Sequence, residues 1–436
     1  MRKIVIVGGG AAGLQVATRL GRRLGKRGLA EIILVDRSPT HLWKPLLHEV
    51  AAGRIEPVVH HTSFALQAER HHFRFVQGEL LAADRINRTI SVAIAGMGDG
   101  VDGRVLSIAY DKLVLAVGGV TQYFGVPGAR EHALTLDSVA KAEEVRDRVF
   151  TALRRRTALA DASPQTPAAK VRVAIVGAGA TGVQLAAQLR RTSSVLNRYG
   201  IHRLDPVTGV DICVIEASPA VVPGMGTRIA ARVSEQLARL HIDVQCSARV
   251  TSVGASGLTI AGQAPMQADV VVWAAGIAAP AMLETFRLPV NAKGQIRVLP
   301  TLQSIEDEHI YAIGDCASCR PQDLDAELPT RAQVAYQQAL YLADALPRRL
   351  AGKQPAGFRY RDYGSLVALA GSSAIANLAA TPGKDNGWHI EGRLAALLHH
   401  AVYRRHVLDI HGWGRALGMT LAQGLERLLA AGTRLH

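Results

Sequence analysis

Cysteine, lysine and acidic side chains are all scarce in this sequence. Its 436 residues include four Cys, too few for a disulfide scaffold in so long a chain, which favours a reducing compartment. The 36 acidic residues face 50 Lys and Arg, for a net charge of +14, and this balance favours anionic partners such as nucleic acid, phospholipid headgroups or phosphorylated ligands. Only nine of the 50 cations are Lys, and Arg can hold phosphate in a bidentate fork that Lys cannot form.

Long apolar runs are also absent. The longest candidate, residues 366–380, is interrupted by two Ser, a Gly and an Asn, so we expect no membrane-spanning helix. At the start of the chain, Met1, Arg2 and Lys3 run directly into an apolar strand-like segment, which predicts that no removable signal segment precedes the fold. If a membrane is involved, the protein is expected to lie on it.

The sequence does contain an internal repeat, and a chain of this length has room for two or three domains. Residues 3–20 read KIVIVGGGAAGLQVATRL and residues 173–189 read VAIVGAGATGVQLAAQL. Each copy is an apolar run, then a Gly-x-Gly-x-x-Gly hexad, then a helix of small residues. In such a crossover the first Gly makes a tight turn, the second lets the backbone approach a pyrophosphate, and the third packs the helix on the strand. The hexad glycines are Gly8, Gly10 and Gly13 in the first copy and Gly177, Gly179 and Gly182 in the second.

Each hexad is followed by a second apolar strand that ends at an acid. Asp36 ends the strand in the first copy, and Glu216 ends it in the second, after a polar insertion near residues 199–205. A carboxylate at this position can accept both ribose hydroxyls of an adenine nucleotide. Since Glu216 would repel a 2'-phosphate and no Arg follows it directly, the second site is expected to prefer NADH over NADPH.

Further strand-like runs predict a doubly wound α/β fold. Residues 112–117, 269–274 and 309–313 are apolar runs that each end near Gly, as strands of a parallel sheet do before a turn. A helix is expected over 138–155, followed by a linker over 158–170 that is rich in Ala, Ser, Pro and Thr.

With these motifs the chain resembles type II NADH:quinone oxidoreductase, the single-subunit, non-proton-pumping NADH dehydrogenase of the two-dinucleotide flavoprotein superfamily. Besides the two hexads and their acids, the resemblance rests on LWKPLLHEVAAG at 42–53, YDKLVLAVGG at 110–119, FGVPGAREHALTL at 124–136, VVWAAGIAAP at 271–280, IYAIGDCA at 310–317, RAQVAYQQA at 331–339 and FRYRDYGSL at 358–366. It covers essentially the whole chain.

The resemblance implies two Rossmann-like domains and a membrane-anchoring tail. The FAD domain would be discontinuous, at 1–118 and 297–385, with the NADH domain inserted at 122–290 and amphipathic anchor helices at 386–436. The implied activity is oxidation of NADH through FAD and reduction of a membrane quinone. The enzyme would sit at the cytoplasmic face of the inner membrane, peripherally, and could form a homodimer.

The resemblance also assigns residues to the two nucleotides. The FAD contacts would be Gly8, Gly10, Ala12, Gly13, Asp36, Arg37, Lys44, Leu80, Ala116, Gly118, Asp315 and Val334. The NADH contacts would be Gly177, Gly179, Thr181, Gly182, Glu216, Ala275 and Gly276. Asp315, at a strand end and expected before a helix, would accept hydrogen bonds from the ribityl hydroxyls of the flavin.

The resemblance also implies four residues for catalysis and the quinone end. The family's Ala-Gln-x-Ala-x-Gln pattern falls here on Gln333, Tyr336 and Gln337. The two Gln lie four apart on one helical face, although amides at this spacing also suit an ordinary helix surface. The fourth is Gln184, where the family commonly carries Glu. An amide hydrogen-bonds but does not ionise, so a carboxylate proton relay at this position is in doubt.

The closest alternative is a sulfide:quinone oxidoreductase, which shares the fold, flavin and membrane acceptor but takes its electrons through cysteines. Cys316 and Cys319 form a Cys-x-x-Cys that keeps this alternative open, and the intact second hexad argues against it. The segment after Asp36 holds no Cys, which excludes dithiol chemistry at the usual site. A redox-controlled, DNA-binding protein is a further alternative, but the Arg residues are dispersed and no nucleic-acid motif stands out, so no nucleic-acid partner is expected.

The C-terminal segment carries two apolar stripes at helical spacing. They are formed by Leu394, Leu397, Leu398 and Ala401 and by Trp413, Leu417, Leu421, Leu425 and Leu428. From 391 to 436 there are six Arg against three acids, as suits a helix that lies on anionic phospholipid. The same pattern also suits packing on the protein's own core or on a dimer partner.

Overall fold

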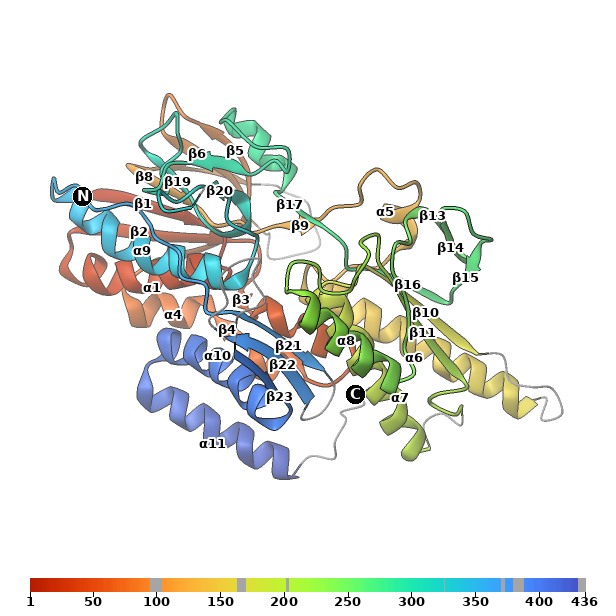
Figure 1. The fold of residues 1–436 in the computed structure, drawn as a ribbon. Coiled ribbons are helices and arrows are strands. Elements are labelled where there is room, and N and C mark those ends of the chain that lie inside the picture. The colour runs from red at the N-terminus through yellow and green to blue at the C-terminus, as the bar shows by residue number, and fades with distance from the viewer. Residues whose placement is uncertain are drawn as a thin grey trace. The chain divides into compact units, whose positions relative to one another are not determined.

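The computed structural model describes residues 1–94, 104–162, 170–200, 204–324, 326–369, 373–378 and 388–429. The chain folds into two compact units, each made of several chain segments (Figure 1). Unit 1 contains residues 1–44, 60–120 and 277–361, and unit 2 contains 45–59, 121–276 and 362–436. Both combine a sheet of parallel strands with helices, which confirms the predicted α/β class.

Unit 1 is built on a seven-stranded sheet in the order β19-β8-β1-β2-β5-β6-β7. Strands β19, β8, β1, β2 and β5 run parallel, and β5, β6 and β7 form an antiparallel meander. The strands are β1 Arg2–Val7, β2 Ala30–Asp36, β5 Arg74–Asp84, β6 Thr89–Ile94, β7 Val105–Ala109, β8 Lys112–Leu115 and β19 Ile310–Ala312. Residues 4–7 of β1, 32–35 of β2 and 113–115 of β8 are all apolar and buried, because a parallel sheet covered on both faces leaves no strand face to water.

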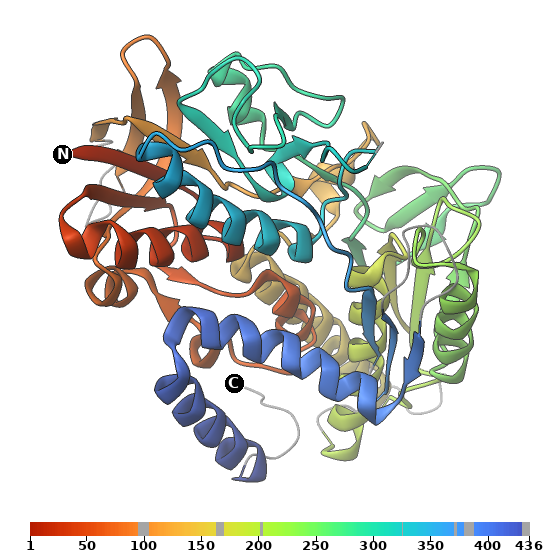
Figure 2. The same ribbon diagram turned by 60° about the vertical axis from the view of Figure 1, so that its left-hand side comes forward.

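Two long helices of unit 1 lie side by side, α1 Ala11–Arg23 and α9 Ala332–Leu350 (Figure 2). The shorter elements with residues in this unit are β3 Thr40–His41, β4 Thr62–Ser63, α4 Phe64–His71, β18 Ile296–Val298, β20 Ala317–Cys319 and the 3-10 turns Gly25–Arg27, Ala281–Phe286 and Gly314–Cys316. At the sequence junctions between the units lie β9 Val120–Thr121, β17 Ile277–Ala278, α3 Pro57–His60 and the 3-10 turn Lys44–Leu46.

Unit 2 is built on a four-stranded parallel sheet in the order β12-β11-β10-β16. Its strands are β10 Val171–Val176, β11 Val210–Ile215, β12 Asp243–Gln245 and β16 Val270–Trp273. Two antiparallel sheets accompany it, one of β13 Val250–Gly254, β14 Gly257–Ile260 and β15 Met266–Gln267, the other of β21 Ser365–Leu369, β22 Ser373–Leu378 and β23 Trp388–Glu391. The helices are α2 Leu47–Ala51, α5 Ala129–His132, α6 Val139–Ala162, α7 Ala180–Arg198, α8 Thr227–Arg239, α10 Arg393–His411 and α11 Trp413–Leu429.

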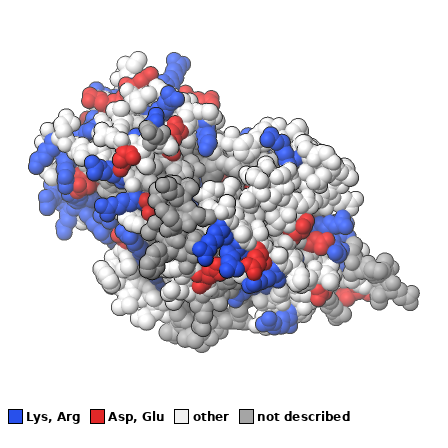
Figure 3. Space-filling view, viewed as in Figure 1, with Lys and Arg blue, Asp and Glu red and all other residues white. Residues whose placement is uncertain are grey.

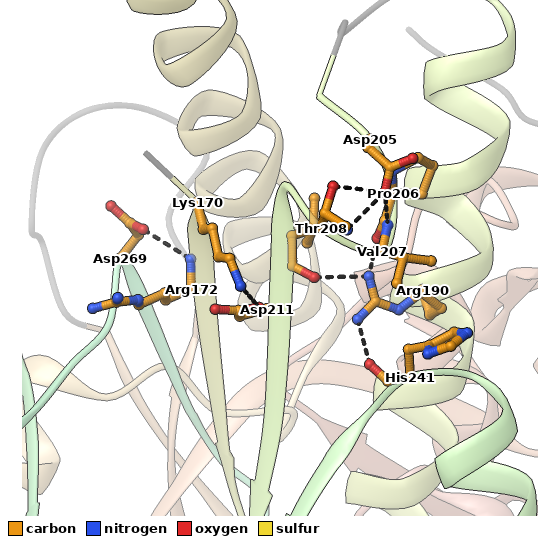
Figure 4. A network of polar contacts seen from close by, with 11 residues as sticks. Lys170, Arg172, Arg190, Asp205, Pro206, Val207, Thr208, Asp211, His241 and Asp269 are labelled. Carbon is orange, nitrogen blue, oxygen red and sulfur yellow. Dashed lines mark hydrogen bonds and ion pairs between the residues drawn. The ribbon is translucent and has the colours of Figure 1, made fainter. Parts of the chain in front are cut away.

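A buried arginine ties three elements of unit 2 together (Figure 4). Arg190, on α7, is 3% exposed. Its guanidinium donates to the carbonyl oxygens of Pro206, of Val210 at 2.7 Å and of His241 at 2.7 Å. Burial lowers the pKa of Arg190, and the carbonyl oxygens take the place of the water that the cation loses.

The helix expected over 138–155 is longer than predicted. The prediction of a linker from 158 was wrong for its first five residues, because α6 continues to Ala162. Those residues include three Ala and one Leu, strong helix formers that continue the helix without interruption. The rest of the predicted linker, over 163–169, and residues 201–203 of the polar insertion lie outside the described residues.

The compact units divide the chain differently from the predicted domains. Residues 362–385 were expected in the FAD domain, but the described strands β21 and β22 contact α7, α8 and α10 within unit 2. Small apolar residues of β22 and α10 pack together, with Ala374 and Ala376 of β22 against Ala395 of α10. The assignment of each nucleotide to a domain stays a prediction.

The C-terminal helices present one face to the protein and another to solvent. On α10, Ala395, Val407 and Ile410 are buried, whereas Leu394 and Leu397 are 58% and 64% exposed. On α11, Trp413 is 83% exposed and Leu417 and Leu421 are each 61% exposed; the side chains of Leu425 and Leu428 lie outside the described residues. Within the part of the chain that the structure describes, no helix is long and apolar enough to cross a bilayer.

The packing of α10 is expected to depend on pH through His406. Burial, with the nearby His411, lowers the pKa of His406 to about 4, whereas an unfolded His titrates near ~6.5. The unfolded chain therefore takes up the proton first, and stability is complete above about pH 6.5 and falls as the pH drops toward 4. Between pH 7 and pH 5 we expect a loss of about 2 kcal/mol, measured by urea unfolding. A His406→Gln variant should lose this pH dependence, and an equal dependence in that variant would contradict the assignment.

Candidate functional site

The first glycine crossover joins β1 to α1 in unit 1. Gly8 follows β1 and turns the chain at a φ of 100°. A Cβ on Gly8 would overlap the backbone at Ala116, and one on Gly13 would overlap the carbonyl of Gly8, so the backbone segments lie too close for any side chain. A Cβ on Gly10 would meet nothing within 4 Å. At Gly8 and Gly13 the crossover packs closely against neighbouring backbone, whereas the space beside Gly10 is open.

The second crossover, between β10 and α7 in unit 2, repeats this geometry. Gly177 has a φ of 104°, and its N–H donates to the carbonyl of Ile215 at 2.7 Å. A Cβ on Gly182 would overlap the carbonyl of Gly177, and a Cβ on Gly179 would meet nothing within 4 Å. The sequence repeat is thus confirmed as a repeat of structure.

Both crossover helices begin without a side-chain cap. Neither α1 nor α7 has a capping hydrogen bond from its N-cap residue, and neither has an acid in its first turn. The first N–H groups of a helix have no partner within the helix, and the helix dipole makes this end positive. An uncapped start that opens at a glycine fits the pyrophosphate of a dinucleotide. The two crossovers therefore each fit one such ligand.

Asp36 lies beside the first crossover at the end of β2. Its carboxylate accepts hydrogen bonds from the N–H of Gly9 at 2.5 Å and of Ser38 at 2.8 Å. Burial raises its pKa, and these two hydrogen bonds oppose that rise. The two N–H donors fix the carboxylate next to the glycine turn, where a nucleotide ribose would lie.

Glu216 occupies the matching place beside the second crossover. Its carboxylate accepts from the N–H of Ala178 at 2.8 Å and of Ser218 at 2.8 Å. The two residues directly after Glu216 are Ala217 and Ser218, and neither supplies an Arg side chain. This carboxylate would bind a ribose diol and repel a 2'-phosphate.

Lys44 acts electrostatically on both Asp36 and Asp315 in unit 1. Its Nζ donates to the carbonyl of Gly119 at 3.3 Å, and its charge opposes the rise that burial causes in the pKa of both Asp36 and Asp315. Gly118 beside it has a φ of 70°. Asp36, Asp315, Lys44 and Gly118, all of them predicted FAD contacts, therefore lie near one another in unit 1.

The turn that carries Asp315 differs from the prediction. A helix was expected directly after it, but the structure has a single 3-10 turn, Gly314–Cys316, followed by β20. The N–H of Gly314 donates to Oε1 of the buried Gln338 at 2.7 Å. The helix that packs against this turn is α9, which begins 17 residues after Asp315, at Ala332. Gln338 was missed because a single amide in an apolar helix face gives no distinctive spacing.

The two glutamines on α9 hold the segment that follows this helix. Gln337 pairs with the backbone of Arg361, donating from Nε2 to its carbonyl at 2.7 Å and accepting from its N–H at 3.0 Å. Gln333 donates from Nε2 to the hydroxyl of Tyr360 at 2.6 Å. They lie on one face, as the spacing predicted, and in this structure they position Tyr360 and Arg361.

The remaining predicted residues fall into buried and exposed groups. Buried are Ala12 on α1, Leu80 on β5, Ala116 after β8, Gln184 on α7 and Val334 on α9. Half-buried or exposed are Arg37, Thr181, Ala275, Gly276 and Tyr336. A Cβ on Gly177 would lie 2.8 Å from the Ala275 N, so Ala275 adjoins the second crossover.

Two aromatic rings next to glycines were missed from the sequence. The ring of Phe64 lies where a Cβ on Gly9 would fall, and the ring of Phe124 lies where one on Gly276 would fall. Phe124 has a φ of 53° and is 61% exposed. A Gly that pairs in space with a distant aromatic leaves no pattern along the chain.

The Cys-x-x-Cys carries no reactive thiol in this fold. Cys316 is fully buried and Cys319 is 1% exposed, and burial raises the pKa of each to about 12. A thiol rather than a thiolate stays in place at neutral pH, and the thiolate is the nucleophile and metal ligand. Among the described residues no group of three or more His, Cys, Asp or Glu side chains is placed to hold a metal ion.

Comparison with known proteins agrees with this geometry. Residues 2–339 match the family model described as pyridine nucleotide-disulphide oxidoreductase. The chain is 33% identical over 450 residues to the type II NADH:quinone oxidoreductase of Haemophilus influenzae, with all of both chains covered. The structure of NDH2 from Plasmodium falciparum in complex with NADH is similar with a TM-score of 0.79 at 18% identity, covering 94% of this chain and 99% of that one. The sulfide:quinone oxidoreductase of Aquifex aeolicus has a TM-score of 0.74 at 16% identity, covering 94% and 91%.

Proposed function

The chain belongs to the family of type II NADH:quinone oxidoreductases, and from this membership and its two nucleotide crossovers we propose that it oxidises NADH through FAD and reduces a quinone. The observation that carries the proposal is the duplicated crossover, with an open glycine, an uncapped helix and a fixed carboxylate in each copy. A protein that needs only one bound dinucleotide has no use for the second complete copy.

The first crossover is proposed to hold FAD. Gly10 and the first N–H groups of α1 would contact the pyrophosphate, and Asp36 would accept from the adenosine ribose. Asp315 and Lys44 lie at the same glycine-rich region, where they would bind the ribityl chain and keep the local charge balanced. When bound, FAD supplies the two-electron chemistry that links a nicotinamide to a quinone.

The second crossover is proposed to hold NADH. Glu216 is fixed by two N–H groups, so it cannot swing away from a 2'-phosphate. A Glu216→Gln variant removes this repulsion and should lower the ratio of kcat/KM for NADH to that for NADPH by about tenfold, or about 1.4 kcal/mol. Glu143→Gln, the same charge change on α6, serves as the control. An unchanged ratio in Glu216→Gln would show that this carboxylate does not select the cofactor.

The quinone end is proposed to lie near Gln333, Tyr336 and Gln337. The two amides hold Tyr360 and Arg361 by hydrogen bonds, so their role is to position that segment beside the glycine turn at Gly314, against which α9 packs. Gln184 cannot release a proton, and the protons of the quinol would come from water or another group.

Steady-state assays of the purified chain test the activity. We expect NADH oxidation that requires a short-chain quinone and FAD. Sulfide in place of NADH should give no quinone reduction, because Cys316 and Cys319 are buried thiols. Sulfide-dependent reduction without NADH would favour the alternative family and overturn the proposal.

Attachment to a membrane surface is proposed for the exposed apolar faces of α10 and α11. Leu394, Leu397, Trp413, Leu417 and Leu421 are all more than half exposed, which is costly in water and favourable at the boundary of acyl chains. We propose the cytoplasmic face of the inner membrane, in keeping with the reduced thiols. The homodimer stays a prediction, and a measurement of the molar mass of the protein in solution tests it.

Removal of the residues after Gly392 tests the attachment. The truncated chain should keep FAD and the reduction of a short-chain quinone, and it should lose most of its binding to anionic vesicles and its reduction of quinone within them. A Trp413→Ser, Leu417→Ser, Leu421→Ser variant of the full chain is expected to act alike, with α10 still packed on its sheet. Unchanged binding to vesicles in both variants would contradict the anchor.

A further inference from the structure

Unit 1 has a cavity of about 560 Å³ on the side of its sheet away from the glycine turns. Arg2 begins β1, Lys112 begins β8 and His309 directly precedes β19, and all three line the cavity. These strands run parallel, so the cavity lies at their amino ends. The turns at Gly8 and Gly314, proposed to hold FAD, follow the carboxyl ends of β1 and β19. The two sites are therefore separated by the length of the strands.

The lining of this cavity is rich in cations. Arg2, Arg88, Lys112 and Arg349 face two acids, Asp111 and Glu308, which leaves a charge of +2 before His309 is protonated. In the described part of the chain, no ion pair involves the guanidinium of Arg88 or Arg349. Figure 3 shows Lys and Arg gathered over the part of unit 1 that holds the N-terminus.

The acids of the lining are already engaged. Asp111 accepts a hydrogen bond from the N–H of Lys3 at 2.6 Å, and Glu308 lies 3.5 Å from the ring of His309. The Lys112 Nζ donates to the carbonyl of Glu308 at 3.1 Å. The acidic side chains of the lining therefore do not neutralise its excess positive charge.

The cations act on one another. The pKa of Lys112 is lowered first by burial and then by Arg349 and Arg88, while Glu308 opposes the change. Like charges held together at a partly buried place cost free energy, and a bound anion would offset this cost. The affinity of the cavity for an anion should therefore depend on the positive charge of these side chains.

Two residues of the lining also interact with a buried hydroxyl. Tyr311, on β19, is 1% exposed. Burial raises the pKa of its hydroxyl, and Arg349 and Gln303, which both line the cavity, oppose that rise. A neutral hydroxyl does not offset the charge of Arg349, so this charge stays available to an anion.

We propose that this cavity binds a polyphosphate anion, such as pyrophosphate or the phosphate chain of a nucleotide, at a site separate from those of FAD and NADH. Three guanidinium groups and one ammonium group spread around the cavity suit several phosphate groups in a row, because Arg holds phosphate oxygens in pairs. A lipid headgroup offers the same phosphate chemistry, and flotation on vesicles distinguishes it from a soluble polyphosphate.

Calorimetric titration of the full-length holoprotein with pyrophosphate tests the site. Saturating NAD⁺ is present so that the second crossover is filled. We expect a saturable isotherm that weakens as salt increases. An Arg88→Gln, Arg349→Gln double variant should bind at least tenfold more weakly, and Arg148→Gln, which removes one Arg from the exposed surface of α6, should bind like the natural chain. The FAD content and NADH oxidation of all variants should be unchanged, which shows that they fold.

Two results would overturn the proposal. One is equal affinity for pyrophosphate in the double variant, which would place the anion elsewhere. The other is an absence of saturable pyrophosphate binding to the natural chain. If flotation of the double variant on phosphatidylglycerol vesicles is then also weaker, these cations belong to a lipid surface. The expected outcome is equal flotation of both proteins, with pyrophosphate bound at least tenfold more weakly only by the double variant.

Discussion

A Gly13→Ala variant is expected to lose FAD. The added Cβ would overlap the carbonyl oxygen of Gly8, and backbone on both sides of the contact leaves no flexible side chain to move away. Opening the contact would shift α1 away from β1, at a cost of at least about 3 kcal/mol, or more than a hundredfold in FAD affinity. The measurement is the flavin absorbance of the purified protein, with FAD titrated back into any apoprotein.

Matched glycine variants separate the possible causes. Gly414→Ala on α11 meets nothing within 4 Å and should keep its FAD. Gly182→Ala, the counterpart in the second crossover, should keep FAD and lose NADH binding. Gly10→Ala should fold, since its Cβ also meets nothing, and should hold FAD more weakly because the methyl group occupies the side open to pyrophosphate. If Gly182→Ala lost FAD and Gly13→Ala kept it, the assignment of the two sites would be reversed.

An Arg190→Met variant is expected to destabilise unit 2 by about 3–5 kcal/mol. Three carbonyl oxygens would lose a charged donor, and an unsatisfied buried acceptor costs about 1–3 kcal/mol. Lys in the same place offers one point charge and cannot reach three separate oxygens, so Arg190→Lys should lie between the two. The measurement is hydrogen exchange of the β10 and β11 amides, which reports the free energy of opening of this sheet.

The neighbouring arginine provides the control for this prediction. Arg191 is half-buried, and Arg191→Met removes the same charge without touching the three carbonyl groups. It should change the free energy of opening by less than about 0.5 kcal/mol. Equal effects of the two substitutions would mean that net charge, rather than the bonds to the carbonyl groups, stabilises this part of the fold.

The crossovers could be predicted because their residues keep a fixed spacing along a strand–helix–strand unit. Gly13 packs against Gly8 within one turn, and the next strand of the unit brings Asp36 to Gly9, so the glycines and the acid recur at characteristic intervals. The same holds for Gly177 and Glu216. Most of the residues that position a nucleotide pyrophosphate can therefore be identified from the sequence.

Features that depend on distant packing could not be predicted. Gln338 bonds to Gly314 across 24 residues, and the rings of Phe64 and Phe124 lie over glycines far from them in sequence. The turn after Asp315 was expected to open a helix, but the next strand pairs with β18 instead. In each case tertiary contacts, which carry no local pattern, decide the structure.

The place of the basic cavity could not be predicted from the net charge either. The excess of +14 predicts anionic partners but gives no location, because its cations come from the start of β1, the β5–β6 turn, the start of β8 and the end of α9. Only the tertiary fold brings these two strand starts, the turn and the helix end to one cavity.

Anaerobic mixing of the holoprotein with NADH, followed by a short-chain quinone, tests the central claim most directly. The absorbance of the bound flavin reports both steps in one cuvette. The two crossovers predict that one equivalent of NADH bleaches the yellow protein and that one equivalent of quinone restores the colour. A flavin that stays oxidised with NADH, or one that is bleached but not restored by quinone, would contradict the proposed transfer of electrons from NADH to quinone.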